Sequence, residues 1–230
     1  MMLQRFDGMQ AAAIALAQQI AATLRAGIAG RGSASLVLAG GRTPVPLFHA
    51  LRELELDWSR IGVTLTDERW VPEDQAGSNA ALVRRELLAG RAAAARFVPL
   101  YDGSASAAAA TAAAWSRLQV LARPFDAVAL GMGEDGHFAS LFPGNEALQA
   151  ALDPAAAPAC VAMRAPAEPR ERMSLNLAAL LQARRVFLLV SGAAKRELLL
   201  AAGRREAPAR WPVGALLAQR EPLTEVYWAP

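Results

Sequence analysis

The sequence predicts an α/β protein in which a mostly parallel, twisted sheet lies between two layers of helices. Apolar, β-rich runs alternate with helical patterns along the chain, as expected of successive βαβ units. Several strands, such as 125–130, are nearly continuous apolar runs, which is typical of strands covered on both faces. The chain has 230 residues, about half of them apolar, so we expect one domain over 1–230.

The first half of the chain begins with an alanine-rich helix that places Ile14, Ile20 and Leu24 on one face. A later alanine tract is also expected to be helical, because alanine is the best helix former. In chain order we expect a helix over 10–25, a strand over 35–39, a helix over 44–53, a strand over 61–65, a helix over 79–88, a short strand over 97–100 and a helix from 105 to about 121.

The second half opens with the central strand 125–130. The stretch 153–170 carries four prolines and is expected to be loop around one strand. Its strand and the later elements are expected at 160–163, 173–175 (strand), 177–181 (helix), 186–190 (strand), 194–201 (helix), 212–218 (helix opened by proline) and 225–228 (strand).

Composition excludes several classes of protein. Cys160 is the only cysteine, which rules out an internal disulfide and a cysteine metal cluster, and we expect it to be a small buried hydrophobic residue. We expect no apolar run to be long enough to span a membrane, and the N-terminus lacks a signal-peptide layout, so we expect a cytoplasmic protein. The net charge is only +3 and the arginines are scattered, which argues against nucleic-acid binding.

Polar clusters follow the strands, where ligands bind in open α/β sheets. The first cluster is Gly40-Gly41-Arg42-Thr43, between a strand and a helix. Glycines let the backbone approach an anion, and the N–H groups at a helix start favour negative charge. The cluster fits a small phosphate, although a tight turn with a threonine cap is an equally good interpretation of this cluster alone.

The second cluster is the run Thr66-Asp67-Glu68-Arg69-Trp70-Val71-Pro72, with Ser78-Asn79 capping the next helix. Three consecutive charges directly after an apolar strand indicate a functional group of residues. The alternative is an exposed charged turn.

The third cluster is a glycine-rich turn after the central strand, running from Gly131 to Pro143. It carries His137, two residues after Asp135, where tuning of the imidazole pKa is plausible. A lone histidine is more often structural than catalytic. The other histidine, His49, lies within a predicted helix and receives no role.

Two further cations follow later strands. Arg172 could bind a phosphate with its planar guanidinium or could be an ordinary edge residue. Lys195 follows Ser191-Gly192 and is the single lysine among 24 basic residues. Because the chain otherwise uses arginine, a lysine at this turn indicates a functional role, such as phosphate binding.

Taken together, these motifs resemble the 6-phosphogluconolactonase family. The most specific match is Asp-Gly-His-Phe-Ala-Ser-Leu-Phe-Pro over 135–143, and the least specific is Gly-Gly-Arg-Thr-Pro over 40–44. The resemblance implies a Rossmann-like α/β/α fold shared with glucosamine-6-phosphate and ribose-5-phosphate isomerases. It also implies hydrolysis of 6-phospho-D-glucono-1,5-lactone in the oxidative pentose phosphate pathway, without metal or cofactor.

The resemblance also implies roles for individual residues. His137 would act as general base and acid, Asp135 or Asp67 would orient its imidazole, and Arg69 would stabilise the oxyanion. Many relatives have serine in place of Arg42, so whether Arg42 supplies positive charge stays open. The remaining implied residues are Gly41, Arg42, Thr43, Arg172 and Lys195 for the phosphate, and Gly40, Asn79 and Gly133 for the rest of the substrate.

Three rival functions remain to be weighed. The isomerase–deaminase branch of the same fold shares Asp-Gly-His but continues to Asn-Glu-Pro, whereas this chain has Leu141-Phe142-Pro143, and phenylalanine cannot transfer a proton. A non-catalytic sugar-phosphate sensor would normally carry a DNA-binding segment before the first strand, which we expect near Leu36. The third rival, a dinucleotide-dependent oxidoreductase, is disfavoured because this chain lacks the glycine fingerprint of such enzymes. For the enzyme we expect a monomer or a weak homodimer.

Overall fold

The computed structural model describes residues 1–204 and 211–230, and at its centre is a seven-stranded sheet. All its paired strands run parallel. Across the sheet the order is β1-β10-β9-β6-β2-β3-β5. Strands that follow β2 in the chain are therefore added on both sides of it, and the order of addition switches sides between β2 and β6. In open α/β sheets such a switch point forms a crevice at the carboxyl ends of the strands. The strands are β1 (Met2–Arg5), β2 (Ala34–Leu38), β3 (Ile61–Leu65), β5 (Arg96–Phe97), β6 (Phe125–Leu130), β9 (Ala183–Ser191) and β10 (Thr224–Ala229).

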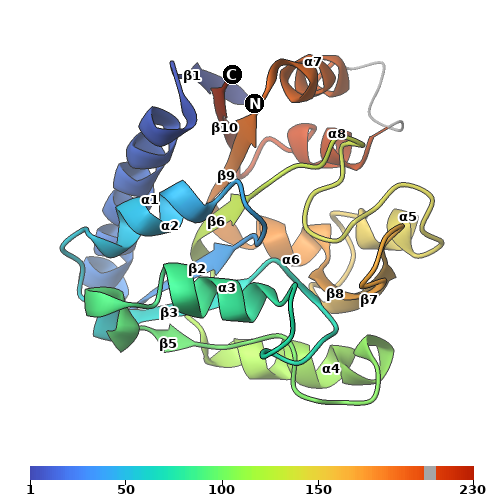
Figure 1. The fold of residues 1–230 in the computed structure, drawn as a ribbon, viewed down its shortest axis with the longest axis horizontal. Coiled ribbons are helices and arrows are strands. Elements are labelled where there is room, and N and C mark those ends of the chain that lie inside the picture. Colours follow the sequence, from blue (N-terminus) through green and yellow to red (C-terminus); the bar gives the residue numbers. More distant parts are fainter. Residues whose placement is uncertain (205–210) are drawn as a thin grey trace.

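Helices flank this sheet, which confirms the predicted α/β/α architecture. Figure 1 shows α1 and α2 to one side of strands β9, β6 and β2, and α6 and α8 to the other. Helix α1 packs against β2, β6, β9 and β10, and α7 packs against β9 and α8. The helices are α1 (Met9–Arg31), α2 (Val45–Arg52), α3 (Asn79–Glu86), α4 (Ala107–Arg117), α5 (Leu148–Ala151), α6 (Leu177–Leu181), α7 (Ala193–Ala202) and α8 (Pro212–Leu217), with 3-10 turns at 58–60, 90–94 and 118–120.

A second, antiparallel sheet lies beside the first and has the order β4-β8-β7. Its strands are β4 (Asp67–Arg69), β8 (Glu171–Leu175) and β7 (Cys160–Arg164). The sequence predicted β7 and part of β8, but it presented 67–69 as a charged cluster that could be an exposed turn. That alternative is wrong, because Asp67 and Glu68 are buried and find hydrogen-bond donors inside the protein.

Helix α1 continues six residues past its predicted end at Arg25 and stops at Arg31. Gly27 lies inside this helix. Glycine is needed at this position because a Cβ there would meet Asp126 Oδ1 at 2.4 Å. By length and composition alone α1 could cross a membrane, so the expectation that no run is long enough was wrong. Half of its apolar window is buried in the protein, however, and core helices of soluble proteins pass the same test.

Besides β4 and the 3-10 turns, two elements were not predicted. The four-residue β1 lies at the edge of the main sheet, where β10 is its one partner among the described strands, and its short run carries polar and half-buried residues. The expectation that the first strand begins near Leu36 is therefore wrong. The other unpredicted element is the single-turn helix α5, which is too short to show a helical repeat. By contrast, Cys160 is buried at the start of β7, as predicted.

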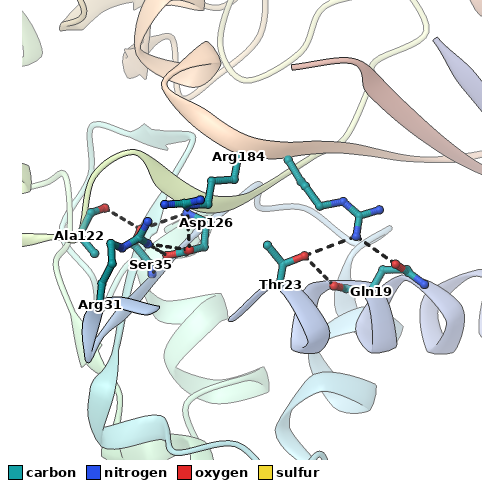
Figure 2. A network of polar contacts seen from close by, with 8 residues as sticks. Gln19, Thr23, Arg31, Ser35, Ala122, Asp126 and Arg184 are labelled. Atoms are coloured by element: carbon teal, nitrogen blue, oxygen red, sulfur yellow. Dashed lines mark hydrogen bonds and ion pairs between the residues drawn. The ribbon is translucent and has the colours of Figure 1, made fainter. Parts of the chain in front are cut away.

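At the amino end of the main sheet, polar groups gather around Asp126 in β6 (Figure 2). Arg31 Nη2 donates to both carboxylate oxygens, at 2.6 and 2.7 Å, and the Ser35 N–H donates at 2.9 Å. The Ser35 hydroxyl donates in turn to the Ala122 carbonyl, and Arg184 lies 3.6 Å from Asp126. Asp126 is completely buried, and this network compensates its negative charge with hydrogen bonds and ion pairs within the protein.

Candidate active site

A cavity of about 330 Å³ opens at the carboxyl ends of β2 and β6, at the switch point of the sheet. It draws together residues of all three polar clusters found in the sequence, and also Arg172. Its lining consists of Ala39, Gly40, Gly41, Thr43, Pro44, Asp67, Arg69, Asn79, Gly131, Met132, Gly133, His137, Ala139, Phe142 and Arg172.

The turn after β2 forms one wall of the cavity. Gly41 has φ +93°, a left-handed conformation that favours glycine. At Gly40 a Cβ would lie 1.9 Å from Asn79 Oδ1, so only glycine allows this close approach. Within the described parts of the chain, the N–H groups of Gly40, Gly41 and Thr43 donate to no other group. They remain available to an anion.

The wall next to this turn is held by Asp67. Its Oδ2 accepts a hydrogen bond of 2.6 Å from the Ser140 hydroxyl, and its Oδ1 accepts one of 2.8 Å from Thr66. Its backbone carbonyl accepts a bond of 2.9 Å from Asn79 Nδ2. Asp67 therefore joins the second cluster to the histidine-bearing turn through Ser140.

His137 lines the same cavity as Asp67 and pairs with the other candidate carboxylate, Asp135. Its Nδ1 is 2.5 Å from Asp135 Oδ1, and its backbone N–H donates to the same oxygen at 3.1 Å. Partial burial opposes ionisation of Asp135, but the hydrogen bonds from His137 outweigh it and hold the pKa of this carboxyl below its ordinary value. The structure thus places Asp135, rather than Asp67, beside the imidazole nitrogen Nδ1.

Gly133 and Phe142 confine the imidazole from two sides. A Cβ on Gly133 would lie 2.1 Å from His137 Cε1, so the ring packs directly against the glycine backbone. The Phe142 ring centroid is 4.4 Å from the imidazole centroid. The ring has little freedom to turn away from the cavity.

Two arginines line the same cavity from adjacent strands. Arg69 in β4 and Arg172 in β8 are direct partners in the antiparallel register, and neither forms an ion pair with a carboxylate of the described residues. Arg172 is only 8% exposed, and its Nε donates to the Pro169 carbonyl at 2.9 Å. Burial, together with the charge of Arg69, lowers the pKa of Arg172. Two unpaired cations side by side attract an anion.

Two predicted phosphate ligands do not line the cavity. Arg42 is exposed and is not among the lining residues. Lys195, in the first turn of α7, donates from Nζ to the Met132 carbonyl at 2.8 Å. This bond ties α7 to the glycine-rich turn behind the cavity wall, and it explains why the lysine is held near the site without entering it.

Sequence reasoning gave no role to Ser140, Phe142 or Glu68, which all contribute to the site. Ser140 and Phe142 stand in the most specific motif, and their proximity to His137 in the chain was the available signal. Glu68 stood between two candidate residues, but nothing in the sequence shows that its carboxylate is buried.

A larger, open groove of about 510 Å³ lies near Phe142, between 143–146 and 164–170. It contains no histidine, and its arginines, Arg164 and Arg170, are exposed on the surface. The smaller cavity is therefore the candidate active site, since there the imidazole, glycine turn and buried cation converge.

Comparison with known proteins agrees with this geometry. Residues 7–228 match the family model described as glucosamine-6-phosphate isomerases/6-phosphogluconolactonase. The chain is 48% identical to a 6-phosphogluconolactonase of Pseudomonas aeruginosa, over 94% of this chain and 89% of that protein. It is 43% identical to a 6-phosphogluconolactonase of Rhizobium meliloti, over 98% of this chain and 97% of that protein.

Solved structures show the same fold. A crystal structure of a 6-phosphogluconolactonase from Shewanella baltica superposes with a TM-score of 0.94 at 38% identity, covering 100% of this chain and 97% of that one. A monomeric glucosamine-6-phosphate deaminase superposes with a TM-score of 0.77 at 18% identity, covering 99% and 97%, and shares the fold alone. This chain therefore belongs to the family of glucosamine-6-phosphate isomerases and 6-phosphogluconolactonases.

Proposed function

We propose that this protein hydrolyses 6-phospho-D-glucono-1,5-lactone to 6-phosphogluconate. One observation carries the proposal: His137, which is paired with Asp135, lines a cavity that also presents Arg69 and Arg172, two cations without a carboxylate partner among the described residues. An imidazole supported by a carboxylate can move protons, and the cations can hold a phosphorylated, negatively charged substrate. The names of the relatives point to the same reaction.

In this proposal His137 acts first as a base. Its Nδ1 is hydrogen-bonded to Asp135, so Nε2 accepts a proton from a water molecule as the water oxygen attacks the lactone carbonyl carbon. The imidazolium formed is stabilised by the ionised Asp135. The same proton then passes from Nε2 to the ring oxygen as the carbon–oxygen bond of the lactone breaks, and the sugar chain opens with a free hydroxyl. The carboxylic acid product releases its own proton to water.

Arg69 is the residue we assign to the developing oxyanion. It lines the cavity from β4, and its Nη1 donates to the Gly77 carbonyl, which fixes the guanidinium at the cavity wall. A preorganised cation at this place would stabilise negative charge on the carbonyl oxygen during attack.

The phosphate would be held by the glycine turn and by Arg172. Gly41 and Thr43 offer N–H groups and a hydroxyl, and Arg172 offers the two terminal nitrogens of its guanidinium. We assign smaller contributions to Arg42, which is exposed, and to Lys195, which is bound to Met132. Gly40, Asn79 and Gly133 would shape the wall against which the sugar packs.

In the proposed mechanism, protein side chains transfer the proton and stabilise the negative charge, and no metal or cofactor is required. Its partner is a small phosphorylated lactone, with no part for nucleic acid or a membrane. We further propose a cytoplasmic enzyme, a monomer or weak homodimer, with residues 1–230 acting as one domain. The residues to which the mechanism gives the largest roles, His137, Arg69 and Arg172, line one cavity.

The purified protein should be assayed with 6-phosphogluconolactone and with glucono-1,5-lactone, which lacks the phosphate. Both lactones hydrolyse slowly in water, so the rate without protein is subtracted. We expect a much larger kcat/KM for the phosphorylated lactone. Equal rates above background would refute phosphate recognition, and brisk release of ammonia from glucosamine 6-phosphate would favour the deaminase reaction instead.

A further inference from the structure

Glu68 is a completely buried acid that the proposed mechanism does not use. It lies in β4 between Asp67 and Arg69, which both line the cavity, while Glu68 itself does not. Its side chain points instead toward the start of α3, on the side of β4 away from the substrate. A buried acid needs hydrogen-bond donors, and the contacts of Glu68 show which groups it holds.

Both carboxylate oxygens of Glu68 accept hydrogen bonds from backbone N–H groups. Oε1 accepts from Asn79 at 2.7 Å and from Arg69 at 2.8 Å. Oε2 accepts from Ala80 at 2.8 Å and lies 3.4 Å from the Ser78 hydroxyl. A carboxylate can accept at both oxygens, whereas a glutamine or a protonated acid must turn a hydrogen toward one of these donors.

These bonds connect two walls of the cavity. Asn79 begins α3 and packs against Gly40 in the anion-binding turn. Arg69 ends β4 and faces the cavity beside Arg172. Residues 70–78 separate Arg69 and Asn79 along the chain, and the Glu68 carboxylate bridges that separation directly.

We propose that the ionised carboxylate of Glu68 is a positioning group that fixes Arg69 and Asn79 relative to each other, so that substrate affinity is lost when Glu68 takes up a proton. This inference rests on the proposed function for its substrate. Glu68 acts through its neighbours and touches no reacting atom.

The surroundings of Glu68 make this proton uptake accessible near neutral pH. Burial raises the pKa of Glu68 to about 7, although the hydrogen bonds from Asn79, Ala80 and Arg69 oppose the rise. The charge of neighbouring Asp67 makes a smaller contribution to this raised pKa. Arg172 from β8 also interacts electrostatically with Glu68, and the first turn of α3 contributes no acid.

The direction of the stability effect separates positioning from a merely structural role. Because the folded state binds this proton more tightly than the unfolded chain, the contribution of Glu68 to stability falls as the pH rises from about 4.5 to about 7. Substrate affinity should rise over the same interval. A residue that only stabilised the fold would move both quantities in the same direction.

The test compares Glu68→Gln with a matched variant, Asp126→Asn, which also neutralises a completely buried carboxylate but at the opposite end of the sheet. At pH 8 we expect Glu68→Gln to raise KM for the phosphorylated lactone about tenfold, since a buried N–H loses its acceptor, with a smaller change in kcat. Asp126→Asn should lower the Tm and leave KM within about twofold of the wild type. Unchanged kinetics in Glu68→Gln, or an equal rise of KM in both variants, would overturn the proposal.

A second measurement uses the unaltered protein and covers the case in which Glu68→Gln does not fold. The backbone amide resonances of Arg69, Asn79 and Ala80 should titrate together by NMR, with a midpoint near 7. The absence of a common titration between pH 5 and 9 would overturn the proposal. Binding of inorganic phosphate at pH 8, compared between wild type and Glu68→Gln, tests the same role if the protein proves not to hydrolyse the lactone.

Discussion

The polar groups near the two ends of strand β6 differ in whether their charges have partners within the protein. At the amino end, the buried Asp126 accepts hydrogen bonds from Arg31 and Ser35, so its negative charge is compensated within the protein (Figure 2). At the carboxyl end, Arg172 is almost as deeply buried, yet it has no carboxylate partner among the described residues. Both ends carry buried charge, but only the charge at the carboxyl end has no opposite charge among the described residues. We call the carboxyl end incomplete and the amino end complete.

This difference indicates which end binds a ligand. A buried charge without a partner is costly, so it persists where a ligand supplies the missing opposite charge. The glycine turn that lines the same cavity as Arg172 adds N–H donors that have no acceptor in the described part of the chain. Substitutions at the incomplete end should therefore change activity, and substitutions at the complete end should change stability.

His137→Ala should have the largest effect on activity. Loss of the general base and acid is expected to lower kcat by about 10²–10⁴-fold, while the Tm stays close to that of the wild type because the side chain is partly exposed. Steady-state lactone hydrolysis and thermal unfolding measure the two quantities. Near-normal turnover by this variant would remove His137 from the mechanism.

Gly133→Ala tests the close packing of the imidazole. The added Cβ would lie 2.1 Å from His137 Cε1 and 2.7 Å from Asp135 Oδ1, so the ring must move. A displacement of about 1 Å is expected to reduce kcat on the order of 100-fold. Gly144→Ala, at a glycine with no atom within 4 Å of its added Cβ, serves as a control for an added methyl group outside the cavity lining, although its φ of +77° adds some backbone strain. Equal activities in the two variants would contradict this packing.

Arg172→Ala should come next, with KM raised about tenfold or more by loss of a charged hydrogen bond to the phosphate. Arg42→Ala is the comparison, since its exposed side chain should change KM by less than about fivefold. Lys195→Ala should lie between them, because the lysine holds the Met132 carbonyl at 2.8 Å. An Arg42 effect as large as that of Arg172 would show that the exposed arginine folds over the substrate.

Asp126→Asn should have the smallest effect on activity. Weakening its pairing with Arg31 is expected to lower the free energy of unfolding by about 3 kcal/mol, with kcat/KM within about twofold of the wild type. Urea unfolding followed by circular dichroism gives the first quantity. A selective loss of catalysis without loss of stability would contradict the contrast between the two ends.

Much of the fold could be predicted from the sequence because its strands are buried on both faces. Strands β2, β3 and β6 read as apolar runs, and each was expected within a residue or two of its observed bounds. The edge strand β1 was missed because a strand with partly exposed faces carries no such run. The end of α1 was missed because Gly27 resembles a helix terminator, whereas it is required by close contact with Asp126.

The candidate site was predicted as a set of residues but not as an arrangement. Strand ends converge in any parallel sheet, so the clusters at Gly41 and His137 could be expected to meet. The choice of Asp135 over Asp67 depends on hydrogen bonds across the tertiary structure, in particular the bond of Ser140 to Asp67. The pairing of Arg69 with Arg172 depends on strand register, which the sequence does not reveal.

The most direct test of the whole account is a double-mutant cycle between the substrate phosphate and Arg172. kcat/KM is measured for the phosphorylated and unphosphorylated lactones with the wild type and with Arg172→Ala. We predict that the preference for the phosphorylated lactone falls at least tenfold in the variant, while hydrolysis of the unphosphorylated lactone changes little. An unchanged preference would contradict the claim that His137 and this buried cation act on one substrate in one cavity.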